Sequence, residues 1–196
     1  MEAKIFDRTD YSEEEYFELF DQFERKIEYH AGRIQMMAGA SGAHNEISMN
    51  LTLGLGKNPG NCKPHSADWA VKIPKFNRYV YPDLSFTCKP PEYEGKNRRF
   101  LINPALLIEV ISGSSNDRDR NSKFDWYFSI PSVREYIVIN SQKFEVKSFL
   151  RKDKKDWYMQ SLWEEDQILT ITSLKTSISL GDIYRNVVLA SGEGDL

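Results

Sequence analysis

The stretch Leu106-Leu107-Ile108-Glu109-Val110-Ile111 decides the fold, because it is an apolar run interrupted by a single carboxylate. Pro104 and the pair Ser112-Gly113 bound it, as turn-forming residues bound a strand. Such a short continuous run predicts a β-strand that is buried on both faces in the interior of a sheet. A lone buried carboxylate is strongly destabilising, so Glu109 must be protonated, paired with a cation or bound to a metal.

Patterns on either side of this strand predict an α+β fold. Ser12 and Glu15 are placed for a capping box that begins a helix through Phe23. Residues 27–29 and 33–37 alternate around a turn, which predicts a hairpin. Further helices are expected over 44–55, 122–129 and 180–187, further strands over 66–73, 79–88, 134–140, 144–150, 157–163, 168–172 and 177–180, and polar loops over 89–103 and 112–121.

This order of elements predicts a central mixed β-sheet flanked by helices, with an N-terminal helix and hairpin and C-terminal β-strands. We expect a single domain over residues 1–190 and a flexible tail over 191–196.

The composition limits the classes of protein. A net charge of −3 gives no general affinity for nucleic acid, so any such binding depends on a local basic patch or a bound metal. Two cysteines, Cys62 and Cys88, make no disulfide framework, and we expect both to be reduced in an intracellular protein. The charged N-terminus is unlike a signal peptide, and no run has the length of a membrane span. These features predict a cytoplasmic protein without membrane contact.

A second carboxylate, Asp83, lies directly after Pro82 in the preceding predicted strand. Proline donates no ladder hydrogen bond, so it indicates an edge, a bulge or a strand start here. On neighbouring strands, Asp83 and Glu109 repel by about 4 kcal/mol at a separation of about 4 Å and an effective dielectric of about 20. Mg²⁺ between them turns repulsion into attraction, because it prefers hard oxygen ligands. The alternatives are a Pro-Asp turn and an ion pair of Glu109 with Arg134 or Arg98.

These acids resemble the Pro-Asp…Glu-x-Lys signature of PD-(D/E)XK nucleases, with Glu109 following Asp83 after 26 residues (109 − 83). The resemblance is closest to a bacterial branch described only as restriction endonucleases of unknown function, and it extends from about Tyr16 to Val187. Further matching segments are Met36–Ser41, His44-Asn45, Ser66–Asp68, Asp117–Lys123 and Ser179–Tyr184. The resemblance implies a restriction-endonuclease-like fold and metal-dependent hydrolysis of DNA phosphodiester bonds.

The resemblance also implies roles for particular residues. Asp83, Glu109 and the carbonyl group of Val110 are the expected ligands of Mg²⁺ or Mn²⁺. The lysine of the signature, two residues after Glu109, is replaced here by Ile111. In this branch a lysine at the place of Lys123 stands in for it. We expect Lys123 at the start of a helix, where the helix dipole also favours a phosphate.

Supporting roles are expected for three residues, each with a plainer alternative. His44 lies near the catalytic cleft by resemblance, although a lone histidine is also a common helix cap or surface group. Asp68 is either a third, outer carboxylate or a turn residue. Ser112 either contacts a phosphate or forms the turn that follows the strand.

A local basic patch is expected beside the proposed metal. It consists of Arg118 and Arg120 together with Lys123, and it would contact DNA phosphates without reading sequence. The alternative for Lys123 is a solvated helix residue paired with Asp119 at i−4.

The sequence therefore predicts a Mg²⁺- or Mn²⁺-dependent endonuclease that acts on DNA as a homodimer, so that both strands are cut. A second class is a catalytically inactive nuclease-fold module that binds nucleic acid or a protein partner, and Ile111 favours it. A third is a structural domain in which Glu109 is merely ion-paired. A Lys123 ammonium that points to solvent would favour the inactive module over the enzyme.

Overall fold

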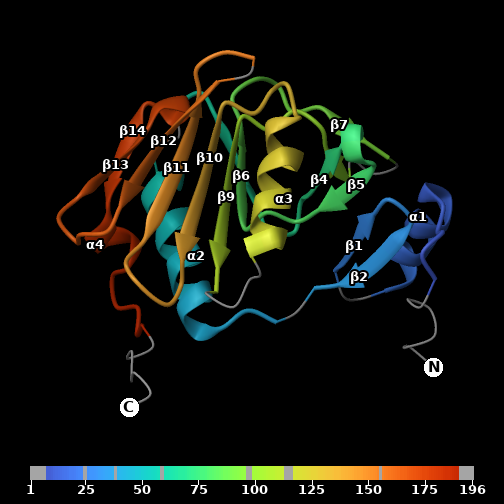
Figure 1. Ribbon diagram of the computed structural model, residues 1–196, viewed down its shortest axis with the longest axis horizontal. Helices are drawn as coiled ribbons and strands as arrows, with labels where there is room; N and C mark the ends of the chain where they lie inside the picture. The colour runs from blue at the N-terminus through green and yellow to red at the C-terminus, as the bar shows by residue number, and fades with distance from the viewer. Residues whose placement is uncertain are drawn as a thin grey trace.

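The predicted interior strand is β9 (Leu106–Ile111), which lies inside a six-stranded sheet of the computed structural model (Figure 1). The structure describes residues 8–23, 26–37, 39–57, 60–95, 99–112, 117–154 and 156–189, except for the side chains of 117–122. β9 runs parallel to β10 (Glu135–Asn140) and antiparallel to β6 (Leu84–Thr87), so the sheet is mixed. The residues of β9 are buried except at its last position, which confirms the predicted interior strand.

Two six-stranded sheets carry most of the described fold. The first has the order β12-β11-β10-β9-β6-β3 and is completed by β3 (Lys63–Ser66), β11 (Val146–Arg151) and β12 (Trp157–Leu162). The second has the order β2-β1-β5-β4-β8-β7, with β1 (Ile27–His30), β2 (Arg33–Met36), β4 (Ala70–Ile73), β5 (Arg78–Val80), β7 (Tyr93–Glu94) and β8 (Phe100–Leu101). A short antiparallel pair consists of β13 (Ile168–Ile171) and β14 (Thr176–Ser179).

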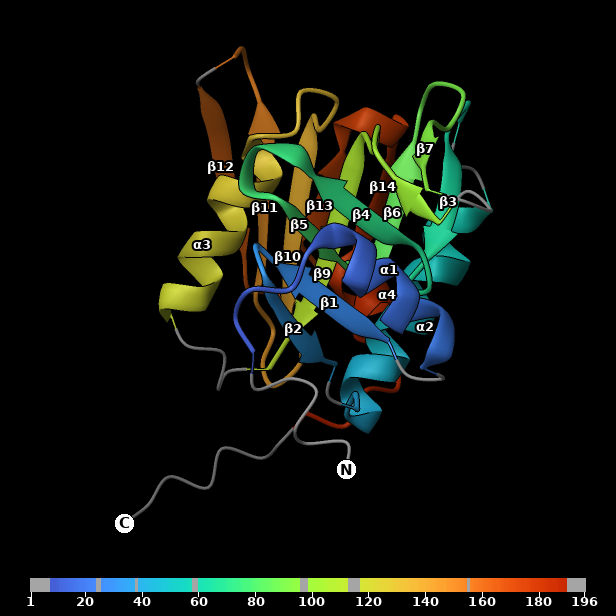
Figure 2. The ribbon, with the colours of Figure 1, turned by 90° about the vertical axis from the view of Figure 1, so that its right-hand side faces the viewer.

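The first sheet is covered on both faces (Figures 1 and 2). On one face, α2 (Gly42–Gly56), α4 (Leu180–Ile183) and the β13–β14 pair form an apolar core with the sheet. On the other, α3 (Asp117–Phe128) and part of the second sheet share a separate core. The helix α1 (Glu13–Gln22) packs on the second sheet through the fully buried Tyr16. β9 therefore lies between two cores, which explains why its sequence is almost continuously apolar.

Local sequence signals account for the N-terminal elements. The Ser12 hydroxyl accepts a hydrogen bond from the Glu15 N–H at 3.1 Å, and the Glu15 carboxylate accepts one from the Ser12 N–H at 2.8 Å, so the predicted capping box is confirmed. The predicted hairpin is also present as β1 and β2, which are joined through Ala31 and Gly32. Both joining residues have positive φ angles, as a tight hairpin turn requires.

Pro82 divides one predicted strand into two. The expected strand over 79–88 is β5 and β6, which belong to different sheets. Because proline has no N–H to donate, the ladder stops and the chain crosses from the second sheet to the first at Pro82-Asp83. The predicted strand over 66–73 is also divided, into β3 of the first sheet and β4 of the second, at the turn of residues 67–69. Asp83 consequently lies where the two sheets meet.

The expectation of reduced cysteines is wrong, because Cys62 and Cys88 form a disulfide. β3 pairs with β6 in antiparallel register, and its first pair is Lys63 with Thr87. The next position of that register places Cys62 opposite Cys88, with their Cα atoms 4.0 Å apart. The long separation in sequence concealed this neighbour relation.

Two other expectations on local structure require correction. The expected loops contain β7, β8 and the first residues of α3, which begins at Asp117 rather than at residue 122. The segment at the start of α3 is almost entirely polar and so shows no helical apolar pattern. The expected tail over 191–196 lies outside the described residues. No helix in the described part of the chain has both the length and the apolar character needed to cross a lipid bilayer.

Candidate active site

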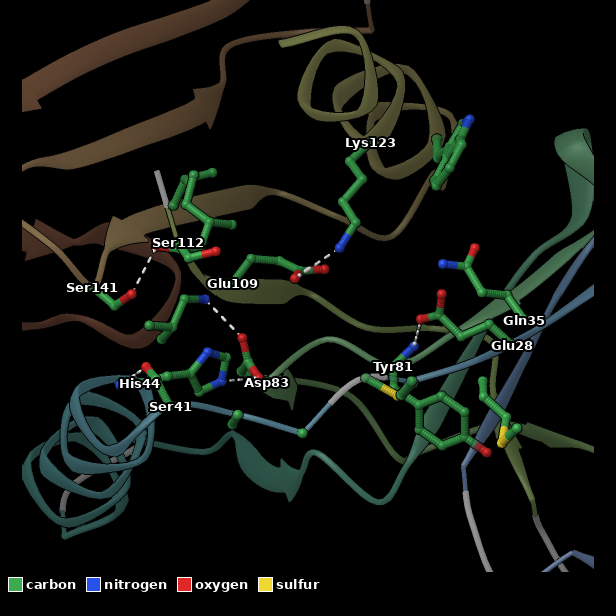
Figure 3. A pocket seen from close by; sticks show the side chains of 18 of the residues that line it. Glu28, Gln35, Ser41, His44, Tyr81, Asp83, Glu109, Ser112, Lys123 and Ser141 are labelled. Carbon is green, nitrogen blue, oxygen red and sulfur yellow. Dashed lines mark hydrogen bonds and ion pairs between the residues drawn. The ribbon is translucent and has the colours of Figure 1, made fainter. Parts of the chain in front are cut away.

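Asp83 directly precedes β6 and Glu109 belongs to β9, so both lie at the end of the ladder between these strands. The last pair in the β6–β9 register is Leu84 with Ile108, so Asp83 occupies the next position, opposite Glu109. The Val110 N–H donates to Asp83 Oδ2 at 2.7 Å, which holds this carboxylate against β9 (Figure 3). The structure thus brings together the two acids that the sequence predicts as metal ligands.

Glu109 is almost fully buried, with its side chain 6% exposed. Its Oε2 atom accepts a hydrogen bond from Lys123 Nζ at 3.0 Å, and its Oε1 atom accepts one from the Tyr127 hydroxyl at 2.5 Å. Burial raises the pKa of Glu109, and the negative charge of Asp83 adds to this rise, while Lys123 and Tyr127 oppose it. The pKa remains raised, mainly because burial disfavours the charged carboxylate.

Lys123 reaches this site from the interior of α3 and not from its start. The helix begins six residues earlier, at Asp117, so the expected contribution of the helix N-terminus to Lys123 is wrong. The ammonium nevertheless points at Glu109 and not to solvent. Burial opposes its charge, but the carboxylates of Glu109, Glu28 and Asp83 outweigh burial and raise the pKa of Lys123. Lys123 is therefore a fixed positive charge beside the acids.

His44 lies in the first turn of α2, behind Asp83. Ser41 caps the helix by accepting a hydrogen bond from the His44 N–H at 3.2 Å. The His44 Nε2 atom is 2.8 Å from Asp83 Oδ1. That contact raises the pKa of His44 against the lowering effect of burial. His44 thus orients the second oxygen of Asp83, as its predicted place near the cleft requires.

Glu28 of β1 is a third acid at the site, and the sequence reasoning missed it. Its Oε1 atom accepts a hydrogen bond from the Tyr81 N–H at 3.0 Å, and its Oε2 atom is 3.0 Å from His30 Nε2. Burial opposes ionisation of Glu28, but His30, Lys123 and the Tyr81 N–H lower its pKa. One signal was available: Glu28 and His30 alternate with apolar residues in the hairpin. The alternation alone does not reveal which part of the protein lies against the face of β1 that carries Glu28 and His30.

Tyr127 was also missed as a site residue. It lies in the helix that was expected over 122–129 and is now seen as α3. Burial raises the pKa of its hydroxyl well above the ordinary value, so the hydroxyl stays protonated and donates to Glu109. A tyrosine in an aromatic helix face gives no sequence signal of such a polar contact.

Glu28, His44, Asp83, Glu109 and Lys123 line a cleft of about 420 Å³ at the meeting of the two sheets, and Tyr127 contacts Glu109 from outside its wall (Figure 3). The wall includes the predicted residues Asp83, Glu109, Val110, Lys123, His44 and Ser112. Ile111 also lines it, and its carbonyl accepts hydrogen bonds from the N–H and hydroxyl of Ser141. The cleft therefore gathers most of the predicted site from α2, the β5–β6 crossing, β9 and α3, and β1 adds Glu28.

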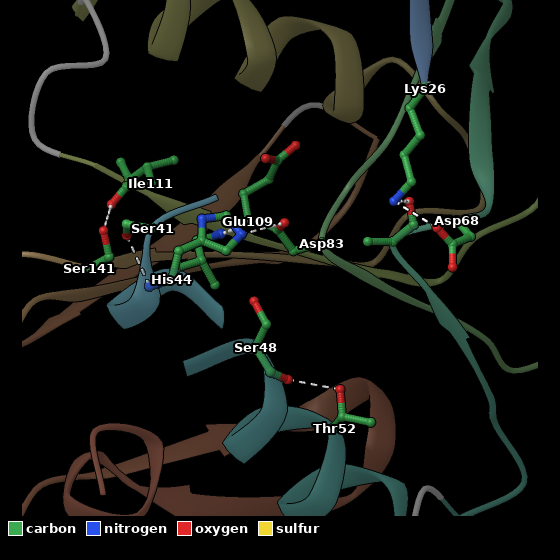
Figure 4. A network of polar contacts seen from close by, with 12 residues as sticks. Lys26, Ser41, His44, Ser48, Thr52, Asp68, Asp83, Glu109, Ile111 and Ser141 are labelled. Carbon is green, nitrogen blue, oxygen red and sulfur yellow. Dashed lines mark hydrogen bonds and ion pairs between the residues drawn. The ribbon is translucent and has the colours of Figure 1, made fainter. Parts of the chain in front are cut away.

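Asp68 is not brought into the described cleft, and the two arginines of the expected basic patch lie outside what the structure describes. The Asp68 side chain is 77% exposed and pairs with Lys26 at 2.7 Å, apart from Asp83 and Glu109 (Figure 4). The structure thus favours the turn reading of Asp68. Arg118 and Arg120 belong to the first part of α3, where the side chains lie outside the described residues.

The chemistry of the donors fits a divalent cation held partly by water. Among the residues that the structure describes, no three His, Cys, Asp or Glu side chains are arranged to hold a metal ion. Each of the four carboxylate oxygens of Asp83 and Glu109 makes one polar contact. Because a carboxylate oxygen has two lone pairs, each oxygen keeps a second position at which it can accept a hydrogen bond or bind a metal ion. The Val110 N–H faces Asp83, and the carbonyl of a strand residue lies on the same side as its N–H. Two carboxylates and one carbonyl suit Mg²⁺, which keeps several waters.

Comparison with known proteins finds a matching family and two similar proteins that this chain covers over most of their length. The model of the Uma2 family, described as "Putative restriction endonuclease", matches residues 13–181. Two proteins of Synechocystis sp. are similar: "Uncharacterized protein slr1290", 30% identical over 90% of this chain and 92% of that protein, and "Uncharacterized protein sll1609", 28% identical over 82% and 92%.

A solved structure confirms the restriction-endonuclease-like fold class. It is that of "a putative nuclease belonging to DUF820" from Anabaena variabilis, with a TM-score of 0.64 and 16% sequence identity. The match covers 84% of this chain and 94% of that one.

Proposed function

Because the chain belongs to the Uma2 family of restriction-endonuclease-like proteins, we propose that it is a metal-dependent endonuclease that hydrolyses phosphodiester bonds of DNA. The observation that carries the proposal is the convergence of Asp83, Glu109 and Lys123 in one cleft. Two acids side by side destabilise a fold unless a cation lies near them. Lys123 supplies one positive charge, and a divalent cation is the natural second.

The proposed cation is Mg²⁺ or Mn²⁺, held by Asp83, Glu109 and the carbonyl group of Val110. Bound there, it lowers the pKa of a water molecule and neutralises charge on the scissile phosphate. The protein's own part is to hold these ligands in place. His44 and the Val110 N–H fix Asp83, while Tyr127 fixes Glu109.

In the nuclease signature a lysine follows the glutamate by two residues, but this chain has Ile111 at that position. Lys123 takes over the role of that lysine. Its ammonium remains charged and lies at hydrogen-bonding distance from Glu109. From this position it donates to a phosphate oxygen and stabilises the charge that grows in the transition state. In the proposed reaction, water oxygen bonds to phosphorus as the bond from phosphorus to O3′ breaks. The departing O3′ takes up a proton, which leaves a free 3′-OH and a 5′-phosphate.

Ile111 is the observation that favours a second function, a nuclease-fold module without catalysis that binds nucleic acid or a protein partner. The side chain that lines the cleft at this position is apolar and adds no charge. The Lys123 ammonium, which points at Glu109, favours the enzyme over the inactive module. Catalysis by the purified chain separates the two functions.

The test is cleavage of supercoiled plasmid and of branched DNA by the full chain with Mg²⁺ or Mn²⁺, compared between wild type, Asp83→Asn and Asp68→Asn. We expect Asp83→Asn to slow cleavage more than about 100-fold, since even the outer partners of metal ligands contribute about 10–100-fold. Asp68→Asn is the matched control, because its carboxylate pairs with Lys26 at the surface, and it should keep full activity. EDTA should abolish cleavage.

Equal rates in wild type and Asp83→Asn would place the activity at another site or in a contaminant. Absence of cleavage by wild type on every DNA, with either cation, would favour the inactive module.

A further inference from the structure

β12 (Trp157–Leu162) is the last strand of the first sheet, and one of its two edges has no strand partner in the described chain. All six of its residues pair with β11, from Trp157 opposite Arg151 to Leu162 opposite Val146. Figure 2 shows β12 at the outer margin of the sheet. Alternate N–H and C=O groups along the outer edge are therefore available to another strand.

This edge lacks the features that usually prevent pairing with another chain. Edge strands are commonly protected by charged side chains, by proline or by a bulge. β12 reads Trp-Tyr-Met-Gln-Ser-Leu, with no charge and no proline, and its register with β11 is continuous. Tyr158 and Met159 point to opposite faces of the sheet, and they are 54% and 55% exposed. An added strand would cover apolar surface on both faces.

The charges at the two ends of β12 are complementary to each other. The turn before it, Lys152–Asp156, contains three lysines and two aspartates, a net charge of +1. The segment after it contains Glu164, Glu165 and Asp166, which are exposed and carry a net charge of −3. In antiparallel pairing of two copies, each acidic end lies beside the basic turn of the other. Parallel pairing would place the two acidic ends together.

We propose that the outer edge of β12 is a self-association surface, on which a second copy of this chain pairs its own β12 in antiparallel register. The twofold axis is perpendicular to the sheet, so the two six-stranded sheets become one and the contact is isologous. The α3 helices then lie on the same face of the joined sheet. Because Glu109 contacts Lys123 and Tyr127 of α3, the Glu109 side chains of both copies lie on that same face. The surface itself does not depend on what the cleft does.

The first test is the mass of the full chain by sedimentation equilibrium across a range of concentrations. We expect wild type to approach twice the chain mass of 22.8 kDa. Met159→Lys places a charge in the middle of the edge and should shift the chain to monomer. Met49→Lys is the matched control, because Met49 is similarly exposed (58%) on α2, and it should leave the dimer intact. Circular dichroism verifies that both variants are folded.

A charge-swap experiment tests the antiparallel arrangement. Glu164→Lys/Glu165→Lys and Lys152→Glu/Lys154→Glu each make the two ends alike in sign, so each variant alone should associate at least about 10-fold more weakly, a change of 1.4 kcal/mol. An equal mixture should recover the wild-type affinity as a heterodimer, since every basic end again meets an acidic one.

Three results would overturn the proposal: a wild-type chain that is monomeric at all concentrations, a Met159→Lys variant that dimerises like wild type, or a mixture that stays as weak as its components. Because every readout is a mass, failure here is distinct from failure of the proposed cleavage.

Discussion

A carboxylate buried inside an apolar strand needs a partner that stabilises it, and Glu109 has two such partners. Lys123 supplies a positive charge and Tyr127 a hydroxyl donor, in place of the ion pair with Arg134 or Arg98 that remained open from the sequence. The need for a partner follows from desolvation and can be predicted from the strand alone. The identity of the partner cannot, because Lys123 is brought there by the packing of α3.

The Lys123–Glu109 pair gives a prediction for stability. Lys123→Met removes the charge but keeps an unbranched side chain only one atom shorter, so we expect the free energy of unfolding to fall by about 3 kcal/mol as Glu109 loses its cation. The double variant Lys123→Met/Glu109→Gln should recover most of this loss, because no charge then lacks its partner. Urea unfolding of wild type, both single variants and the double variant measures the coupling.

The control is Lys143→Met, which removes an exposed partner of Glu145 and should cost less than about 1 kcal/mol. Additive losses in the double variant, equal to the sum of the two single ones, would show that the buried pair is not coupled.

At the scale of elements, local patterns located most helices and strands but not their breaks. The capping box at Ser12 and the apolar run of β9 depend on nearby residues, and both were predicted correctly. Pro82 was recognised as a break, but the sequence does not say that the two parts join different sheets. The disulfide likewise depends on the β3–β6 register, which no local pattern contains.

The disulfide gives a prediction for this pair of strands. Cys62 and Cys88 are 26 residues apart, so closing that loop should stabilise the fold by about 3.5 kcal/mol through the entropy of the unfolded chain. Urea unfolding with and without a reductant should show a difference of this order. The variant Cys62→Ser/Cys88→Ser should not respond to the reductant. Two freely reactive thiols in the native chain, isolated without reductant, would contradict the bond.

At the scale of the whole molecule, the cleft exists because two sheets meet at the chain crossing of Pro82-Asp83. The acids of the first sheet could be predicted, since they stand out in their strands. Glu28 belongs to the second sheet, and no sequence pattern relates the two sheets to one another. Asp68 was open between an outer carboxylate and a turn residue, and only the fold decides between them by placing its side chain at the surface beside Lys26. With a net charge of −3, the proposed binding of DNA would depend on a local basic patch or on a bound metal.

Binding of Mn²⁺ to the full chain, measured by titration calorimetry and by the electron paramagnetic resonance signal of free Mn²⁺, tests the central claim most directly. The account predicts a Mn²⁺ site in wild type that is lost in Asp83→Asn and in Glu109→Gln and retained in Asp68→Asn. Equal binding by all four chains, or no binding by wild type, would contradict a metal site built from Asp83 and Glu109.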